Sequence, residues 1–239
     1  MTARRVVVSV ECMRNQLTRI SKISGVCFAA FNLFKVALNP KNTPNALAVS
    51  DNLLKLGLFK SGVDYLRSNP LTAPLVDNPY TVSEFDLDRM IQLPTGSLGY
   101  ELASVMKKDN LDPNYFRRSN PPVEGKVILD HIEQTHDIWH IVLGFDISEA
   151  GEVGILAFQF GQLRSPQAVA FMSGALMRCL LGNLTNLPPV MDAMTRGWEL
   201  SKKWPPLFAV NWNEVMHEQV DTIRDQLARG LIPTSSLNH

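Results

Sequence analysis

The chain has 239 residues, enough for one large domain with a sizeable core, and its 23 lysines and arginines balance 23 aspartates and glutamates. This zero net charge argues against a nucleic-acid-binding protein, which would carry a basic excess. Three widely spaced cysteines, Cys12, Cys27 and Cys179, form neither a disulfide framework nor a zinc knuckle, and they favour a reducing compartment.

Residues 1–20 are predicted to form a loosely ordered extension outside the fold. Val6–Val10 is the one convincing β-branched run, and it lies at the end of the chain. Basic residues outnumber acidic ones here, but the valine run differs from the amphipathic, Arg- and Ser-rich pattern of a transit peptide. We therefore favour a bacterial-type cytoplasmic chain. Asn32 and Lys35 interrupt the apolar stretch over 25–38, which is too short to span a bilayer.

Residues 21–230 are predicted to form a single all-α domain, a multi-helix bundle with little or no β-structure, followed by a tail over residues 231–239. Apolar residues recur every three to four positions, whereas strand-like alternation is scarce. Prolines mark the breaks, as at Asn39-Pro40 and in a Pro-rich connection over 69–79. The predicted helices span residues 14–38, 43–60, 98–108, 123–144, 152 onward, 167–182, 189–203 and 213–229, with a short one opened by residues 83–86.

The segment 167–182 (QAVAFMSGALMRCLLG) differs from the other predicted helices because it is apolar nearly all round. A helix of this kind is buried, or it faces lipid or a partner. A homodimer is the default expectation for an apolar helical protein of this size.

Two histidines and two carboxylates form the most informative motif in the chain. His136, Asp137 and His140 fall within about one turn of the predicted helix over 123–144. At about 100° per residue the two histidines lie about 40° apart around the helix axis, so both can face one cation. Glu152 follows after eleven residues and would close the coordination sphere from a second element. All four residues are therefore candidate metal ligands.

The residue types narrow the metal but leave alternatives for the site. Imidazole and carboxylate ligands suit zinc, iron or manganese better than magnesium. Asp137 stands where zinc proteases carry a glutamate, and its shorter side chain suits a ligand, or a group that orients a histidine, better than a catalytic base. Asp146 and Glu149 compete with Glu152 as the closing ligand. Glu133 lies on the same helix face, so part of the motif could be an ordinary polar stripe.

The pattern His136-Asp137-x-x-His140-x11-Glu152 resembles, in full, the signature of the coenzyme Q (ubiquinone) biosynthesis protein 4 family. The similarity extends over roughly residues 40–230. Residues 93–99 resemble the family's Pro-Gly turn ahead of a helix, residues 135–144 (THDIWHIVLG) its metal helix, and Gly151-Glu152 with Phe158 and Gln162 the segment that follows.

The resemblance implies an all-helical protein that associates peripherally with membranes and binds a divalent metal through the four motif residues. Zinc is the expected metal, with iron, manganese and magnesium as alternatives. The implied ligands are polyprenylated benzenoid precursors of ubiquinone, and the implied partners are other quinone-biosynthesis proteins. The family is regarded both as an organiser of the biosynthetic complex and as acting in decarboxylation at ring carbon 1. In a eukaryotic cell the expected location is the matrix side of the mitochondrial inner membrane.

Our leading hypothesis is therefore a metal-dependent decarboxylase, a carboxy-lyase, that acts on a polyprenylated hydroxybenzoate-type precursor. Apolar residues beside the motif, such as Ile138 and Leu156, would either fill the core or line a cleft for the isoprenoid tail. The alternative is a non-catalytic scaffold that binds prenyl lipid, with aromatic residues over 198–212 at an interface. A zinc hydrolase is a third hypothesis, disfavoured because no glutamate follows His136.

Overall fold

The computed structural model describes residues 43–112, 114–115, 123–182 and 184–234, together with Leu33. Within these ranges the predicted all-α fold is confirmed, since they contain helices, no β-strand and one isolated bridge between Ser97 and Gln219. The run Val6–Val10, the extension over residues 1–20, most of the helix predicted over 14–38 and the last five residues of the tail lie outside the described residues.

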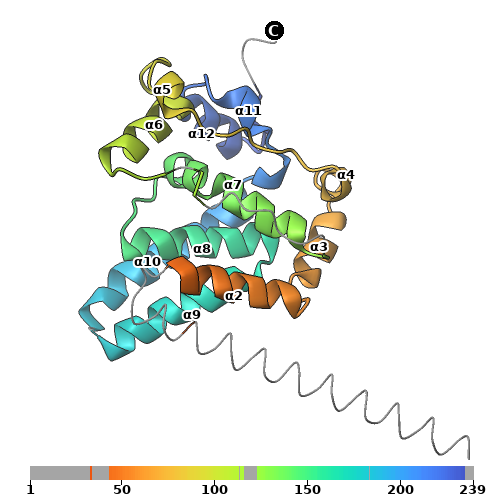
Figure 1. Ribbon diagram of the computed structural model, residues 1–239, viewed down its shortest axis with the longest axis vertical. Coiled ribbons are helices and arrows are strands. Elements are labelled where there is room, and N and C mark those ends of the chain that lie inside the picture. The colour runs from red at the N-terminus through yellow and green to blue at the C-terminus, as the bar shows by residue number, and fades with distance from the viewer. Residues whose placement is uncertain (1–32, 34–42, 113, 116–122, 183, 235–239) are drawn as a thin grey trace, which may run out of the picture.

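The helices follow one another along the chain and are labelled in Figure 1. The first half of the fold contains α2 (Thr43–Lys55), α3 (Lys60–Arg67), α4 (Ala73–Asp77), α5 (Leu87–Met90) and α6 (Leu98–Lys108). The second half contains α7 (Lys126–Leu143), α8 (Glu149–Leu163), α9 (Pro166–Leu181), η1 (Leu184–Asn186), α10 (Leu187–Lys203), η2 (Leu207–Ala209), α11 (Trp212–Val215) and α12 (Val220–Ala228).

Two predicted helices are shorter than the sequence pattern indicates. The helix expected to reach Lys60 ends at Lys55, because Gly57 takes a left-handed conformation that turns the chain into α3. The helix expected over 213–229 is broken between α11 and α12. Residues 216–220 there lie alongside residues 96–99, and three backbone hydrogen bonds of 2.9 to 3.0 Å join the two segments. These backbone groups cannot also complete a continuous helix.

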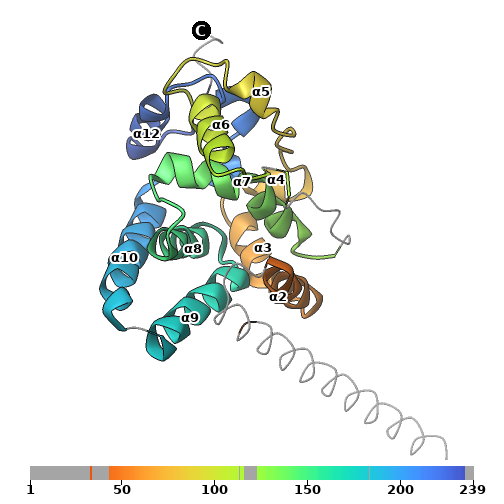
Figure 2. The same ribbon diagram turned by 60° about the vertical axis from the view of Figure 1, so that its left-hand side comes forward.

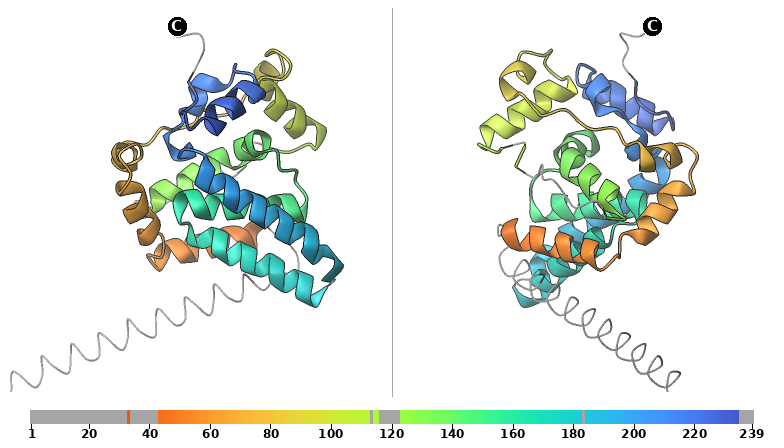
Figure 3. Two further views of the ribbon diagram at one scale, coloured as in Figure 1. Left: turned by 180° about the vertical axis from the view of Figure 1, so that it is seen from behind. Right: turned by 45° about the vertical axis from the view of Figure 1, so that its right-hand side comes forward.

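Helix α7 occupies the middle of the fold (Figure 1). On one side of it lie α8, α9 and α10, with α2 and α3 beside them, and on the other lie α5, α6, α11 and α12. The same order is visible when the molecule is turned (Figures 2 and 3). In the described part of the chain, no helix combines the length and apolarity needed to cross a membrane.

Helices α8 and α10 cross at very short range because small residues meet at their contact. A Cβ atom at Gly197 of α10 would overlap the carbonyl oxygen of Gly154 on α8. Further along the same pair of helices, a Cβ atom at Gly161 of α8 would overlap the side chain of Ser201 on α10. The backbones of α8 and α10 therefore lie almost in contact at Gly154 and Gly197, and no larger side chain fits there.

Aromatic residues from distant parts of the chain fill the core around α7. Trp139 meets Phe158 edge-on at 5.4 Å between ring centroids, and Phe158 meets Trp204 at 6.2 Å. Phe208 and Trp212, which the sequence left open as interface residues, are buried. The apolar residues beside the histidine motif are also buried, including Ile138, Val142 and Leu156, so they belong to the core.

His131 packs against core aromatic residues and cannot be charged at low cost. Its ring lies 5.7 Å from that of Trp139 and 4.7 Å from that of Phe208, and its Nε2 is buried without a hydrogen-bond partner among the described residues. Burial lowers the pKa of His131 from 6.5 to about 3. The folded protein therefore holds this ring neutral at any pH where the protein is normally handled.

We expect His131→Phe to reduce the loss of stability in acid. The unfolded chain protonates His131 below pH 6.5, whereas the folded chain does so only near pH 3. With respect to this group the wild type therefore has its full stability above pH 6.5 and loses stability as the pH falls below that value. Between pH 6 and 4 the unfolding free energy of the variant should gain on the wild type by up to about 1.4 kcal/mol per pH unit. Urea unfolding of both proteins at several pH values measures this difference. If the unfolding free energies of variant and wild type changed in parallel with pH, the prediction would be contradicted.

Candidate metal centre

Helix α7 holds the two histidines of the motif one above the other. They are four residues apart, so their side chains leave the same helix face. The two Nε2 atoms lie 3.1 Å apart, and the ring centroids are separated by 4.7 Å. His140 is buried on the inner side, whereas the His136 side chain is 26% exposed. His140 thus faces the core, and His136 lies nearer the surface.

Glu152 reaches the two histidines from the first turn of α8. Its Oε1 lies 3.2 Å from Nε2 of His140, and its Oε2 lies 3.4 Å from Nε2 of His136. One possible ligand atom from each residue falls within 4.8 Å of the other two. The structure therefore brings three of the four predicted ligands together, with one carboxylate oxygen toward each imidazole.

The connection between α7 and α8 aims Glu152 at the histidines. Gly144 takes a left-handed conformation and ends α7, and Ser148 caps α8 by accepting a hydrogen bond from the backbone N–H of Gly151 at 3.1 Å. The capped helix begins at Glu149, three residues earlier than predicted from the sequence. Gly151 is needed because a Cβ atom there would overlap the carbonyl oxygen of Asp146.

The orientation of His140 is fixed by a second contact. Its Nδ1 lies 3.1 Å from the carbonyl oxygen of Phe145, which can only accept a hydrogen bond. Nδ1 must therefore carry the proton, and Nε2 presents its lone pair to the space shared with His136 and Glu152. Metal-binding histidines are held in this way by a carbonyl or carboxylate behind the ring.

The electrostatics of the three residues are strongly coupled. Burial alone would lower the pKa of His136, but the hydrogen bond to Glu152 and the negative charges of Glu152 and Asp137 together raise it to about 9. Burial would raise the pKa of Glu152, yet its contacts with His136 and His140 hold it well below its usual range. The carboxylate is therefore ionised, as a metal ligand must be.

The other carboxylates of the motif region have different roles. Asp137 adds negative charge beside His136, but its oxygens are not part of the group that converges within 4.8 Å. Glu149, a competing ligand on sequence grounds, pairs with Arg178 at 3.0 Å. Asp146 accepts hydrogen bonds from the backbone N–H and the hydroxyl of Ser148. Assignment of Asp137 as a fourth ligand stays a prediction.

Two arginines that the sequence did not single out support the end of the metal helix. Arg196 donates to the carbonyls of residues 143–144 at 2.6 and 3.2 Å, and Arg224 donates to those of residues 141–142 at 2.8 and 3.0 Å. Cations at a helix C-terminus satisfy carbonyls that have no intrahelical partner and complement the helix dipole. These arginines lie 52 to 83 positions from their partners, so no local signal could have found them.

The donor set fits a divalent transition metal. The raised pKa of His136 keeps a proton on its ring in the metal-free protein, and a bound metal would displace that proton. Two imidazole nitrogens and one carboxylate oxygen would then match the three protein ligands of many zinc sites, in which a fourth position stays open to water or substrate. The histidine orientation and the ionised Glu152 agree with that use. Such a set would leave the ion with one net positive charge, which Asp137 beside it would partly offset.

A family model confirms the resemblance drawn from the motif. The model for coenzyme Q (ubiquinone) biosynthesis protein Coq4 matches residues 72–232, which include all four motif positions. The chain is 29% identical to a protein of known structure from Nostoc punctiforme that is described as a candidate ubiquinone biosynthesis protein. The two folds agree with a TM-score of 0.75 over 85% of this chain and 96% of that one.

Fungal proteins named ubiquinone biosynthesis protein COQ4, mitochondrial, are also similar. The one from Eremothecium gossypii is 26% identical over 147 residues, 60% of this chain and 45% of that protein. The one from Komagataella phaffii is 24% identical over 212 residues, 80% of this chain and 63% of that protein. The chain thus spans less than two thirds of the length of these relatives.

Proposed function

Because this chain belongs to the coenzyme Q (ubiquinone) biosynthesis protein Coq4 family, we propose that it is a metal-dependent protein of ubiquinone biosynthesis that acts on a polyprenylated hydroxybenzoate-type precursor. The observation that carries the proposal is the convergence of His136, His140 and Glu152 on one point from two helices. These residues would hold the metal, with Asp137 as a possible fourth ligand or as a nearby charge.

The proposed reaction is loss of the carboxyl group from carbon 1 of the aromatic ring. The bond between carbon 1 and the carboxyl carbon breaks, carbon dioxide leaves, and the electron pair that remains on the ring takes up a proton. A bound divalent cation supplies positive charge that orients the carboxylate or phenolic oxygens and stabilises negative charge as it develops. With iron the same ligands would also suit an oxidative route.

The exposure of the three ligands supports access from one side. Glu152 is 42% exposed and His136 is 26% exposed, whereas His140 backs onto the core beside Trp139. A head group would therefore approach over Glu152 and His136, while the buried side of the site excludes water. Because the apolar neighbours on α7 and α8 fill the core, an isoprenoid tail would have to lie on another surface.

A carbon dioxide assay with the metal-loaded full-length chain tests the reaction. The substrate is a short-chain prenylated hydroxybenzoate with a labelled carboxyl group. We expect labelled carbon dioxide from the wild type and at least about a hundredfold less from His140→Ala, because the metal supplies the main charge stabilisation. Wild type that binds the substrate and metal but releases no label would reject the decarboxylase and favour the scaffold.

A scaffold remains the second candidate because the α9–α10 connection exposes apolar side chains. Leu180, Leu181 and Leu184 are 57 to 64% exposed, and residues 179–191 include no charged side chain. Exposed apolar clusters of this kind mark contacts with proteins or membranes. This tip would serve the proposed peripheral membrane contact or a contact with other biosynthetic proteins. Sedimentation with lipid vesicles tests the membrane contact, which is rejected if the protein stays in the supernatant.

The homodimer and the compartment are further proposals. A dimer would give an apolar surface such as the one on α9 a self-complementary partner. Size-exclusion chromatography with light scattering tests the dimer, which is rejected if the measured mass is that of a monomer.

We propose a cytoplasmic location in a bacterial host, or the matrix side of the inner membrane in a eukaryotic host. The mitochondrial names of the fungal relatives support the second case, and fractionation of the native host decides between them.

A further inference from the structure

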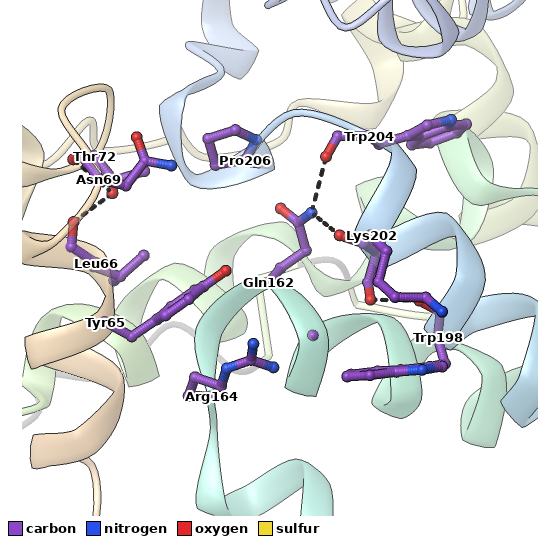
Figure 4. A pocket seen from close by; sticks show the side chains of 12 residues that line it. Tyr65, Leu66, Asn69, Thr72, Gln162, Arg164, Trp198, Lys202, Trp204 and Pro206 are labelled. Carbon is purple, nitrogen blue, oxygen red and sulfur yellow. Dashed lines mark hydrogen bonds between the residues drawn. The ribbon is translucent and has the colours of Figure 1, made fainter.

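A cavity of about 250 Å³ lies at the far end of α8 from the candidate metal centre, where α3 and the end of α10 meet it (Figure 4). Gln162 and Arg164 line it from α8, ten and twelve residues beyond Glu152. At 1.5 Å per helical residue, this places the cavity about 15 Å from the metal ligands along the helix axis. It is therefore a separate feature of the molecule.

The lining is rich in hydrogen-bond donors and positive charge. In Figure 4 Arg164 lies below Gln162, Lys202 lies on the right, and Tyr65 lies on the left with its hydroxyl directed toward Gln162 and with Asn69 above it. The Asn69 oxygen already accepts from the backbone N–H of Leu71, so its NH₂ group is left for a ligand. None of the described residues that line the cavity has a carboxylate. Such a lining is complementary to an anion.

The back wall of the cavity is rigid. The side chain of Gln162 is buried and its amide nitrogen donates to the carbonyls of Ser201 and Trp204 at 3.0 and 3.4 Å. Its oxygen accepts from the backbone N–H of Leu207 at 2.9 Å. Gln162 thus ties α8 to the segment after α10, and its own polar groups are occupied. Specificity must come from the side chains in front of it.

Arg164 occupies a backbone conformation that disfavours it. It ends α8 with φ 51° and ψ 36°, in the left-handed region where glycine is normally found. A Cβ atom comes too close to the neighbouring carbonyl oxygen in this region, so the conformation is strained for arginine. The guanidinium is held 4.6 Å from the ring centre of Tyr65 and 5.5 Å from that of Phe160, and no described carboxylate pairs with it. Strained residues of this kind cluster at sites that bind ligands.

Neighbouring helices position Tyr65 and Lys202, which line the cavity together with Arg164. Gly62 lets α3 lie close to the carbonyl of Leu163, which carries Tyr65 to the edge of the cavity. On the other side, Lys202 lies 5.5 Å from the ring centre of Trp198 and also contacts Glu199 at 2.5 Å. Among the residues that the structure describes, no carboxylate competes for Arg164, whereas Lys202 is shared with Glu199 and is the weaker contributor.

We propose that this cavity binds the oxyanion of a small organic acid, a carboxylate or a phosphate monoester, with Arg164 as its principal counter-ion. The volume equals that of about eight water molecules at roughly 30 Å³ each, so it exceeds a bare ion and admits a small organic body. Arginine binds two oxygens of either group at once. The site is independent of the metal centre and of the reaction proposed there.

Benzoate and phenyl phosphate, which share a ring and differ in the acid group, are suitable probes for the full-length protein. Calorimetry measures their affinity, and the emission of Trp198 and Trp204 reports binding at the cavity. We expect saturable binding of at least one probe to the wild type. Arg164→Gly should bind at least about tenfold more weakly, since it loses a charge-assisted contact. Glycine suits the left-handed backbone, so this variant should keep its thermal stability.

Two further variants make the test decisive. Lys202→Gln should weaken binding by a smaller factor than Arg164→Gly, because Lys202 is shared with Glu199. Glu152→Gln should leave the affinity unchanged, which separates this site from oxyanion binding at the metal centre. The proposal is overturned if neither probe binds the wild type, if Arg164→Gly binds as tightly, or if Glu152→Gln abolishes binding.

Discussion

Glu152→Gln is expected to weaken the binding of zinc to the purified protein by at least about a hundredfold. Glu152 supplies the one negatively charged ligand among the three that converge, and its two oxygens face both imidazoles at 3.2 and 3.4 Å. An amide removes that charge while it keeps nearly the same size, so the fold should persist. Competition with a chromophoric chelator measures the affinity of each variant.

The matched control for Glu152→Gln is Glu149→Gln. Glu149 lies in the same turn of α8, but its carboxylate pairs with Arg178 and is absent from the converging group. Its loss should leave zinc affinity nearly unchanged. Equal losses in both variants, or none in either, would remove this cluster as the metal site. The variant Asp137→Asn tests whether Asp137 is a fourth ligand. Loss of a neighbouring charge should weaken zinc binding by about ten- to a hundredfold, whereas loss of a direct ligand should weaken it more.

Gly197→Ala is expected to lower the free energy of unfolding by about 3 kcal/mol, as overpacking of a close contact does. In the middle of an ordinary helix the same change is stabilising by about 0.5 to 1 kcal/mol. The sign reverses here because the new methyl group would overlap the carbonyl of Gly154, which is backbone within α8 and cannot rotate away. Chemical denaturation followed by circular dichroism measures the change.

Thr195→Ala provides the comparison on the same helix. Thr195 is exposed on α10, so its replacement should alter stability by less than about 0.5 kcal/mol. Gly197→Ala should also reduce zinc affinity, because Glu152 lies only two residues before Gly154 and moves with α8. A stabilised Gly197→Ala protein would show that α8 and α10 do not meet as closely as described.

The predictions for Glu152→Gln and Gly197→Ala both depend on the fixed position of α8. Its first turn delivers Glu152, its middle lies against α10, and its last residues form the wall of the cavity at Arg164. A change at the α8–α10 contact therefore reaches both candidate sites, whereas changes at Glu152 or Arg164 should remain local. This difference allows the effects of fold and of chemistry to be separated.

Features that depend on neighbours along the chain were predictable from the sequence. The helix over 98–108 was predicted with the bounds that the structure shows, because a Pro-Gly turn and the capping Ser97 define its start locally. The spacing of His136 and His140 already required a shared helix face, whereas Glu152 was favoured over Asp146 and Glu149 by the resemblance to the family signature. Periodicity and capping act over a few residues, so one sequence suffices to read them.

Only the tertiary structure decided which distant groups meet. It separated Glu152 from Glu149 and Asp146 by giving the latter two other partners, and it broke the predicted 213–229 helix where that segment lies against residues 96–99. It also brought Arg196 and Arg224 to the end of α7 and formed a cavity beside the strained Arg164. A helical pattern states which face is apolar but not what covers it, because that depends on contacts between positions dozens of residues apart.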